Sequence, residues 1–316
     1  MSRVLCVGQL AADILVRPVD RLDFASDTRR VEPIRLSNGG DGLNVAIGLR
    51  RLGFEVGFAG LVGEDQWGDF LASVIERERI DGRGLKRTGE AGTCTVLVAI
   101  NSQGERTFFY YGGANDLFSL REVDPTLVSE AQAVYVGGTY LLPRFDGEGA
   151  AELLRGARAR GKLTAMDVTW DVEGRWLPVI APCLPHLSWF LPSTKEAARI
   201  TGLGEPGDMA AFLRDRGVDN VVIKLGERGC YVLPEGRAGF VAPAFPVRAV
   251  DTTGAGDSFV AGFLAGLLRG WEPERSARLA CAVAALNIQK VGATAGMPTS
   301  AEVDKFMEAQ SGRART

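Results

Sequence analysis

The chain has 316 residues, of which 46% are hydrophobic, and its 36 basic and 39 acidic side chains leave a formal net charge of −3. This length supports a large core, and the absence of a basic block or stripe argues against a nucleic-acid partner. No apolar run is long enough to span a membrane, and no signal peptide precedes the first strand pattern, so we expect a cytoplasmic protein. Scattered cysteines and a single histidine, His186, indicate neither a disulfide scaffold nor a zinc site.

Short apolar runs alternate with helical patterns along most of the chain. The expected strands are Leu5–Gly8, Ala133–Val136, Leu163–Met166, Trp189–Leu191 and Val221–Ile223. Helices are expected at 44–52 and 150–160, each followed by a glycine, and an antiparallel hairpin at 229–241 should close the sheet edge. The alternation predicts an α/β fold, a three-layer α/β/α sandwich around a mostly parallel sheet.

Two segments, approximately 12–37 and 92–113, break this alternation. Both contain strand-like pieces, and the second forms a hairpin about a turn at 101–104. We expect them to form a small β-sheet lid within a single domain spanning residues 1–316. Residues 108–111 place aromatic side chains on both faces of one strand, so we predict a homodimer through the lid. A lid that packs only on its own domain is the alternative.

Residues 254–256, which we call the anion turn, are three small residues that lead into an apolar helix. Gly254, Ala255 and Gly256 leave backbone N–H groups uncovered at a helix start, where they can bind phosphate. Asp257 lies inside this site and would repel a bound phosphate. We therefore interpret Asp257 as a base that takes the proton of an attacking hydroxyl. The alternative is that Asp257 only caps the helix.

A second glycine cluster, at 37–44, precedes another expected helix. Gly39 and Gly40 allow a ligand to approach the backbone. Asp13 can bind hydroxyls with both carboxylate oxygens, and Asn44 offers a donor and an acceptor, which suits polyol recognition. Alternatively, Asp13 caps a turn and the two glycines form only a tight connection.

Together the two clusters resemble the signatures of the ribokinase-like (PfkB) family of carbohydrate kinases. The N-terminal signature is similar to NGGDGLNVA at Asn38–Ala46 with Arg51–Gly53, and the C-terminal signature is similar to DTTGAGDSF at Asp251–Phe259. The resemblance covers nearly the whole chain. It implies ATP-dependent phosphorylation of a sugar hydroxyl, with Asp257 as the base and the N–H groups of the anion turn as an anion hole.

The resemblance also implies roles for individual positions. The expected acceptor site comprises Asp13, Gly39, Gly40, Asp41 and Asn44. The expected nucleotide site comprises Lys224, Gly226, Gly229 and Ser193. Mg²⁺ is expected on the phosphates of ATP with Glu196 nearby, directly or through water. Asp251 and the carbonyl of Thr253 are expected to bind a monovalent cation, K⁺.

One position departs from the family pattern, and another bears on the charge of the substrate. Ser193 replaces a common asparagine ahead of Glu196, which puts metal or phosphate positioning in doubt. Asp41 would repel an acid sugar and favours a neutral one, although Arg106 or Arg144 could pair with an acid sugar if either points inward. A nucleoside kinase with the same machinery and a catalytically silent sugar sensor are the alternative functions.

Overall fold

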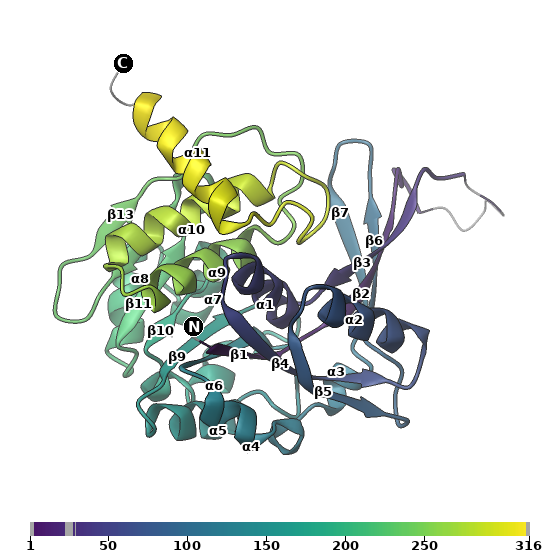
Figure 1. Ribbon diagram of the computed structural model, residues 1–316, viewed down its shortest axis with the longest axis horizontal. Coiled ribbons are helices and arrows are strands. Elements are labelled where there is room, and N and C mark those ends of the chain that lie inside the picture. Colours follow the sequence, from purple (N-terminus) through teal and green to yellow (C-terminus); the bar gives the residue numbers. More distant parts are fainter. Residues whose placement is uncertain (1–2, 23–27, 29, 314–316) are drawn as a thin grey trace.

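The computed structural model describes residues 3–22, 28 and 30–313. Its centre is a nine-stranded sheet with the order β13-β12-β11-β10-β9-β8-β1-β4-β5 (Figure 1). Neighbouring strands run parallel, except that β12 is antiparallel to both β11 and β13. The strands are β1 (Arg3–Gly8), β4 (Glu55–Gly63), β5 (Asp81–Thr88), β8 (Ala133–Thr139), β9 (Leu163–Val168), β10 (Trp189–Phe190), β11 (Asn220–Lys224), β12 (Cys230–Leu233) and β13 (Phe240–Ala242). The predicted parallel sheet with an antiparallel hairpin at its edge is confirmed.

Helices cover both faces of this sheet. One face carries α1 (Asp41–Arg51), α2 (Gln66–Arg77), α9 (Ala255–Leu268), α10 (Pro273–Asn287) and α11 (Ser300–Arg313). The other carries α3 (Ala114–Leu117), α4 (Pro125–Glu130), α5 (Glu148–Arg158), α6 (Leu177–Ile180), α7 (Thr194–Thr201) and α8 (Pro206–Arg214), with the 3-10 turns η1 (Leu120–Glu122) and η2 (Leu184–His186); a third, η3 (Gly226–Arg228), follows β11.

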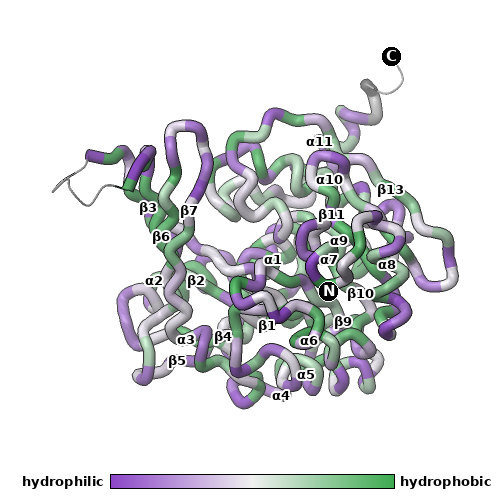
Figure 2. Tube along the Cα trace, turned by 180° about the vertical axis from the view of Figure 1, so that it is seen from behind, coloured by the Kyte–Doolittle hydropathy of each residue, from purple (hydrophilic) through white to green (hydrophobic). Residues whose placement is uncertain are grey.

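Side chains of the central strands divide between two cores. In β1, Val4 and Cys6 enter the core beneath α1 and α9, while Leu5 and Val7 enter the core on the opposite face. This alternation is the period of two expected of a strand buried on both faces, and hydrophobic residues accordingly recur along the central strands (Figure 2). The predicted three-layer sandwich is confirmed. None of the described helices combines the length and hydropathy needed to cross a bilayer.

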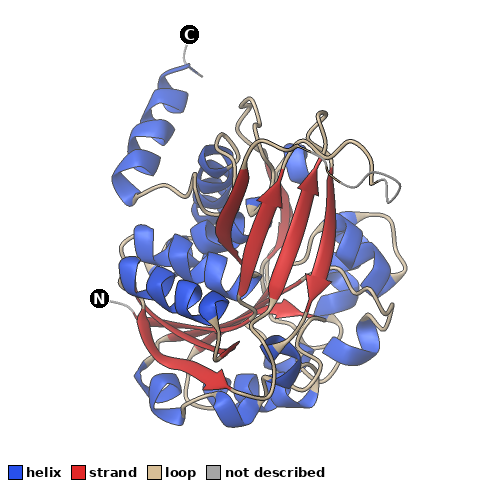
Figure 3. Ribbon diagram, turned by 90° about the vertical axis from the view of Figure 1, so that its right-hand side faces the viewer, coloured by secondary structure: helices blue, strands red, loops and turns tan. Residues whose placement is uncertain are grey.

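Four further strands form the lid, in the order β3-β2-β6-β7. They are β2 (Ala11–Val16), β3 (Ile34–Gly39), β6 (Thr95–Ile100) and β7 (Arg106–Tyr111). The two central strands, β2 and β6, are parallel, and the outer pairs are antiparallel. In Figure 3 the lid strands stand side by side with no helix in front of them. Positions 23–27 and 29 of the expected lid segment lie outside the described residues.

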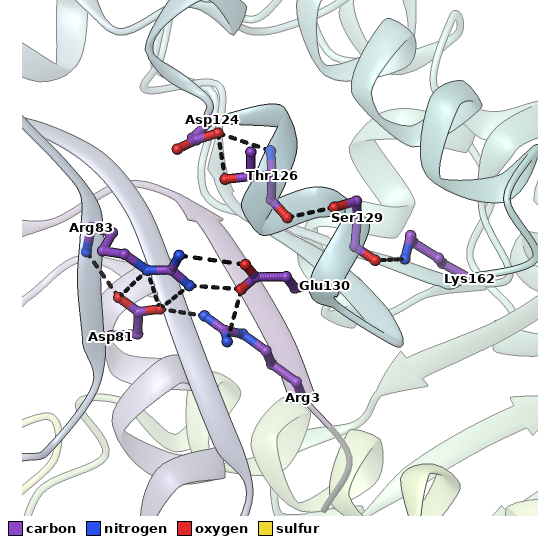
Figure 4. A network of polar contacts seen from close by, with 8 residues as sticks. All are labelled: Arg3, Asp81, Arg83, Asp124, Thr126, Ser129, Glu130 and Lys162. Atoms are coloured by element: carbon purple, nitrogen blue, oxygen red, sulfur yellow. Dashed lines mark hydrogen bonds and ion pairs between the residues drawn. The ribbon is translucent and has the colours of Figure 1, made fainter.

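The two ends of the parallel strands differ in chemistry. At the amino ends, Arg3, Asp81, Arg83 and Glu130 form a surface network of ion pairs between β1, β5 and α4 (Figure 4). At the carboxyl ends, the strands meet the starts of α1 and α9, two helices that pack on each other. Ligands of α/β sheets bind at carboxyl ends, and the predicted site residues gather at this edge.

Candidate active site

The anion turn forms the amino end of α9. Gly254 precedes the helix with a φ of 70°, and a Cβ at this position would lie 2.2 Å from the carbonyl oxygen of Ala293. Glycine is therefore required here. The N–H of Ala255 donates to the carbonyl of Thr252 at 3.2 Å, so one of the three predicted donors is used by the turn itself. Within the described chain, the N–H groups of Gly254 and Gly256 donate to no other group and are left for a ligand.

Asp257 does not cap its helix, since α9 begins without a side-chain cap. Its carboxylate instead accepts a hydrogen bond from Nδ2 of Asn44 at 2.8 Å, and the Asp257 side chain is buried. Oδ1 of Asn44 accepts from Nδ2 of Asn38 at 3.1 Å, and Asn38 also contacts Oγ1 of Thr294 at 3.2 Å. A buried chain of amides thus joins lid strand β3 to Asp257, and it leaves Asn44 one amide hydrogen for a ligand.

The surroundings of Asp257 place its titration near neutral pH. Burial raises the pKa of Asp257 to about 6; the hydrogen bond from Asn44 and the charge of Lys224 oppose this rise, and the charges of Asp167 and Glu196 add to it. A carboxyl group with a pKa close to the working pH can accept a proton and release it again. These are the properties of a general base.

Lys224 supplies positive charge beside the anion turn. A Cβ on Gly256 would lie 3.4 Å from its Nζ, and Nζ forms a buried ion pair with the carboxylate of Asp167. Burial lowers the pKa of Lys224, but the charges of Asp167 and Glu196 outweigh this effect and hold it above its usual range. Sequence analysis missed Asp167. The signal was its place directly after the predicted strand at 163–166, at a carboxyl end.

The residues expected to bind the acceptor form an acidic cluster. The carboxylate of Asp13, on β2, lies over Gly39, where a Cβ would be 2.3 Å from Oδ2. Gly40 has a φ of 90°, and a Cβ there would lie 2.6 Å from a backbone atom. Burial and then the charge of Asp41 raise the pKa of Asp13 to about 7. Burial and then the charge of Asp257 raise the pKa of Asp41. The fold therefore brings Asp13, Asp41 and Asp257 together.

The residues expected near the nucleotide and Mg²⁺ lie at two places, the start of α7 and the end of β11 with the loop that follows it. Ser193 and Glu196 form the capping box of α7, with the Ser193 N–H 2.7 Å from the Glu196 carboxylate and the Glu196 N–H 3.4 Å from the Ser193 hydroxyl. The charge of the Glu196 carboxylate also raises the pKa of Lys224. Gly226 is exposed, with no atom within 4 Å of its Cβ position, whereas a Cβ on Gly229 would lie 2.0 Å from a carbonyl oxygen of β13. Gly229 thus fixes the hairpin of β12 and β13.

The carboxylate of Asp251 is surrounded by hydrogen-bond donors. Oδ1 accepts from the N–H and hydroxyl of Thr253 at 2.9 and 2.7 Å, and from Nη1 of Arg106 at 2.8 Å. Oδ2 accepts from the N–H of Gly292 at 2.8 Å. Oδ1 thus receives three donors and Oδ2 one, and the guanidinium of Arg106 places a positive charge directly against this carboxylate. The monovalent cation implied by the resemblance does not fit beside that charge, because like charges repel. Arg144 lines a separate cavity whose lining includes none of the predicted site residues.

Comparisons with known proteins identify the family and the fold. The sequence matches the pfkB family of carbohydrate kinases over residues 1–300. It is 30% identical to 5-dehydro-2-deoxygluconokinase of Shouchella clausii, over 86% of each chain. It is also 30% identical to aminoimidazole riboside kinase of Salmonella typhimurium, over 86% of this chain and 88% of the relative. The structure of Arabidopsis thaliana ribokinase, complexed with ribose and ATP, superposes with a TM-score of 0.85 at 25% identity, covering 97% of this chain and 98% of that one.

The match extends over most of the chain, and both the fold and the enzyme class agree with the expectation from the two glycine motifs. The protein therefore belongs to the pfkB family of carbohydrate kinases.

Proposed function

We propose that this kinase transfers the γ-phosphoryl group of ATP to a hydroxyl of a small uncharged carbohydrate, with Asp257 as the general base. The observation that carries the proposal is the position of Asp257, which is buried beside the anion turn, bonded to Asn44 and not used as a helix cap. A carboxylate placed in this way can accept the hydroxyl proton as the oxygen attacks phosphorus.

The other residues of the site have complementary roles in this proposal. Asp13 and the free amide hydrogen of Asn44 bind acceptor hydroxyls and direct one of them toward Asp257. The N–H groups of Gly254 and Gly256, with the ammonium of Lys224, stabilise negative charge on the transferred group. The proton moves from the acceptor to Asp257, and no covalent enzyme intermediate is needed.

The proposal includes Mg²⁺ bound to the phosphates of ATP. In the described part of the chain, no group of three or more His, Cys, Asp or Glu side chains is placed to hold a metal. This suits Mg²⁺, which prefers phosphate oxygens and water to a protein cage. Glu196 would hold it through water, since one of its oxygens already accepts from the backbone of Ser193. When bound, Mg²⁺ supplies neutralisation of phosphate charge.

The charges around the acceptor site favour a neutral substrate. Beyond the effect of burial, the charge of Asp41 raises the pKa of Asp13, and the charge of Asp257 raises the pKa of Asp41. A carboxylate on the acceptor would add a further negative charge to this cluster and would be repelled when the cluster is ionised. Of the two arginines that could pair with an acid sugar, Arg106 is paired with Asp251, and Arg144 lines a separate cavity.

A nucleoside acceptor is the second candidate, because one relative at 30% identity is a riboside kinase. A panel of neutral hexoses, pentoses, ketodeoxy acids and nucleosides, assayed with ATP and Mg²⁺ by ADP release, distinguishes these classes. The proposal predicts the highest kcat/KM for a neutral sugar. A preference for a ketodeoxy acid or a nucleoside would contradict it, and sugar binding without any ADP release would favour the sensor.

The lid also supports the proposed homodimer. Leu36, Ile14, Leu97 and Phe109 are direct neighbours across β3, β2, β6 and β7, so they form one row on one face. Three of these side chains are exposed by 39–44%, and Ile34, beside this row on the same face, is exposed by 65%. Contiguous exposed apolar side chains mark interaction surfaces. Because the patch crosses a whole sheet face, we propose a second copy as its occupant.

Leu97→Glu tests this surface, because it places a charge at the centre of the row. Sedimentation velocity should give a dimer for the native chain and a monomer for the variant. Arg83→Gln, at the amino edge of the main sheet, is the control and should leave the dimer intact. A monomeric native chain would contradict the proposal.

A further inference from the structure

Arg106 connects the lid to the loop that carries the anion turn. It is the first residue of β7, 145 positions before Asp251 in the sequence. Its Nη1 donates to Oδ1 of Asp251 at 2.8 Å, and its Nη2 donates to Oγ1 of Thr252 at 2.9 Å. The guanidinium thus holds two successive side chains of one loop. Both partners lie within three residues of Gly254.

The same loop is tied to the anion turn on its other side. The hydroxyl and N–H of Thr253 bond to Asp251, and the carbonyl of Thr252 accepts from the N–H of Ala255. The position of the Asp251 carboxylate therefore sets the backbone that enters Gly254, whose φ is 70°. Any group that neutralises and fixes Asp251 also fixes the direction of the anion-turn donors.

Asp251 already has such a group. Its side chain is 9% exposed and that of Arg106 is 21% exposed, so the ion pair is largely shielded from water. Burial raises the pKa of Asp251, but the bonds from Thr253 and Gly292 and the charge of Arg106 outweigh this effect and lower it below its usual range. Asp251 is therefore ionised, and a second cation placed against it would be repelled by the guanidinium.

We infer that Arg106 takes the place of the monovalent cation that the family resemblance implies at Asp251 and Thr253, and that it makes phosphoryl transfer depend on the lid position instead of on K⁺. Lowering the lid brings the guanidinium to Asp251 and orders the anion turn. Raising it removes this charge and loosens the turn. Arg106 is a positioning residue in this scheme, since it acts through Asp251 and Thr252. The kinetic part of the inference depends on the proposed kinase function.

The test compares Arg106→Gln with the native protein in KCl and in tetramethylammonium chloride of equal ionic strength. Gln keeps hydrogen-bonding capacity but removes the charge, which opens Asp251 to a small cation. Arg83→Gln is the matched control, because it also removes a guanidinium that pairs with an aspartate (Figure 4). This pair lies at the amino ends of the parallel strands, whereas the predicted site lies at their carboxyl ends. Two quantities are measured, kcat/KM for ATP with the best sugar, and the melting temperature without any substrate.

For the native protein and for Arg83→Gln, kcat/KM in the two salts should agree within about twofold. The melting temperature of each protein should be the same in both salts. Arg106→Gln should lose about 10–100-fold in kcat/KM in tetramethylammonium, recover at least part of it in KCl, and melt higher in KCl because the cation binds only the folded state. A native enzyme activated severalfold by K⁺ would overturn the inference, as would a folded Arg106→Gln that responds to K⁺ in neither measurement. The melting experiment remains decisive even if no sugar is phosphorylated.

Discussion

Replacing Asp257 by Asn separates the proposed base from every other role of this residue. The substitution preserves side-chain shape, and the amide oxygen of Asn can still accept the hydrogen bond from Asn44. No capping interaction is lost, because α9 has no side-chain cap. The amide cannot take up the hydroxyl proton. We therefore expect normal binding of ATP and sugar with a much slower reaction.

The magnitude follows from the loss of general-base catalysis, which is worth roughly 10²–10⁴-fold. At about 1.4 kcal/mol for each factor of ten, this corresponds to about 3–5 kcal/mol of transition-state stabilisation. The loss should fall on kcat, while the KM values of both substrates change little.

The thermal stability of Asp257→Asn should not fall with its kcat. Burial raises the pKa of Asp257 to about 6 from a model-peptide value near 4. A raised pKa means that the native state is relatively more stable at low pH and loses this stability as pH rises through 6. At pH 8 the ionised carboxylate thus costs up to about 3 kcal/mol. Asp257→Asn removes this cost, so its melting temperature at pH 8 should equal or exceed that of the native chain.

Steady-state ADP release and thermal melting at pH 8 measure the two effects on one protein sample. Asp124→Asn is the matched control. Asp124 is a true helix cap that accepts from the N–H of Thr126 at 2.8 Å, and its replacement should leave kcat unchanged. A folded Asp257→Asn with near-native kcat would refute the assignment of the base and direct the search to another carboxylate.

Three further changes test the rest of the site. Asp13→Ala should raise the KM for the best sugar, since losing a charge-assisted hydrogen bond costs about 1.5–3 kcal/mol; an unchanged KM would remove Asp13 from the acceptor site. The native kcat/KM should increase with pH through about 6, as Asp257 becomes ionised, and a flat profile between pH 5 and 7.5 would contradict a base with this pKa. Lys224→Met should destabilise the fold by about 3–5 kcal/mol because it leaves Asp167 buried without its partner, and adding Asp167→Asn should restore most of this loss; equal unfolding free energies for the single and double variants would argue against the ion pair.

Local sequence patterns determined the architecture and the anion turn. Alternating apolar runs predicted a parallel sheet with two helix layers, because each strand buried on both faces must be continuously apolar. The turn at Gly254 was also predictable. Its small residues and the helix that follows are adjacent in the chain, so the free N–H groups are a local property of backbone geometry.

Only the tertiary structure decided the partners of the charged and amide side chains. Asn38 and Thr294 meet across 256 positions, and Arg106 meets Asp251 across 145. Such contacts follow from the packing of the lid and α1 against α9, and no short motif encodes them. The same holds for Asp167 and Lys224, which lie on strands separated in the sheet by β10. The sequence by itself determined which chemical groups are available, whereas the folded chain determined which charge each of them faces, because electrostatic and hydrogen-bond energies depend on distances through space.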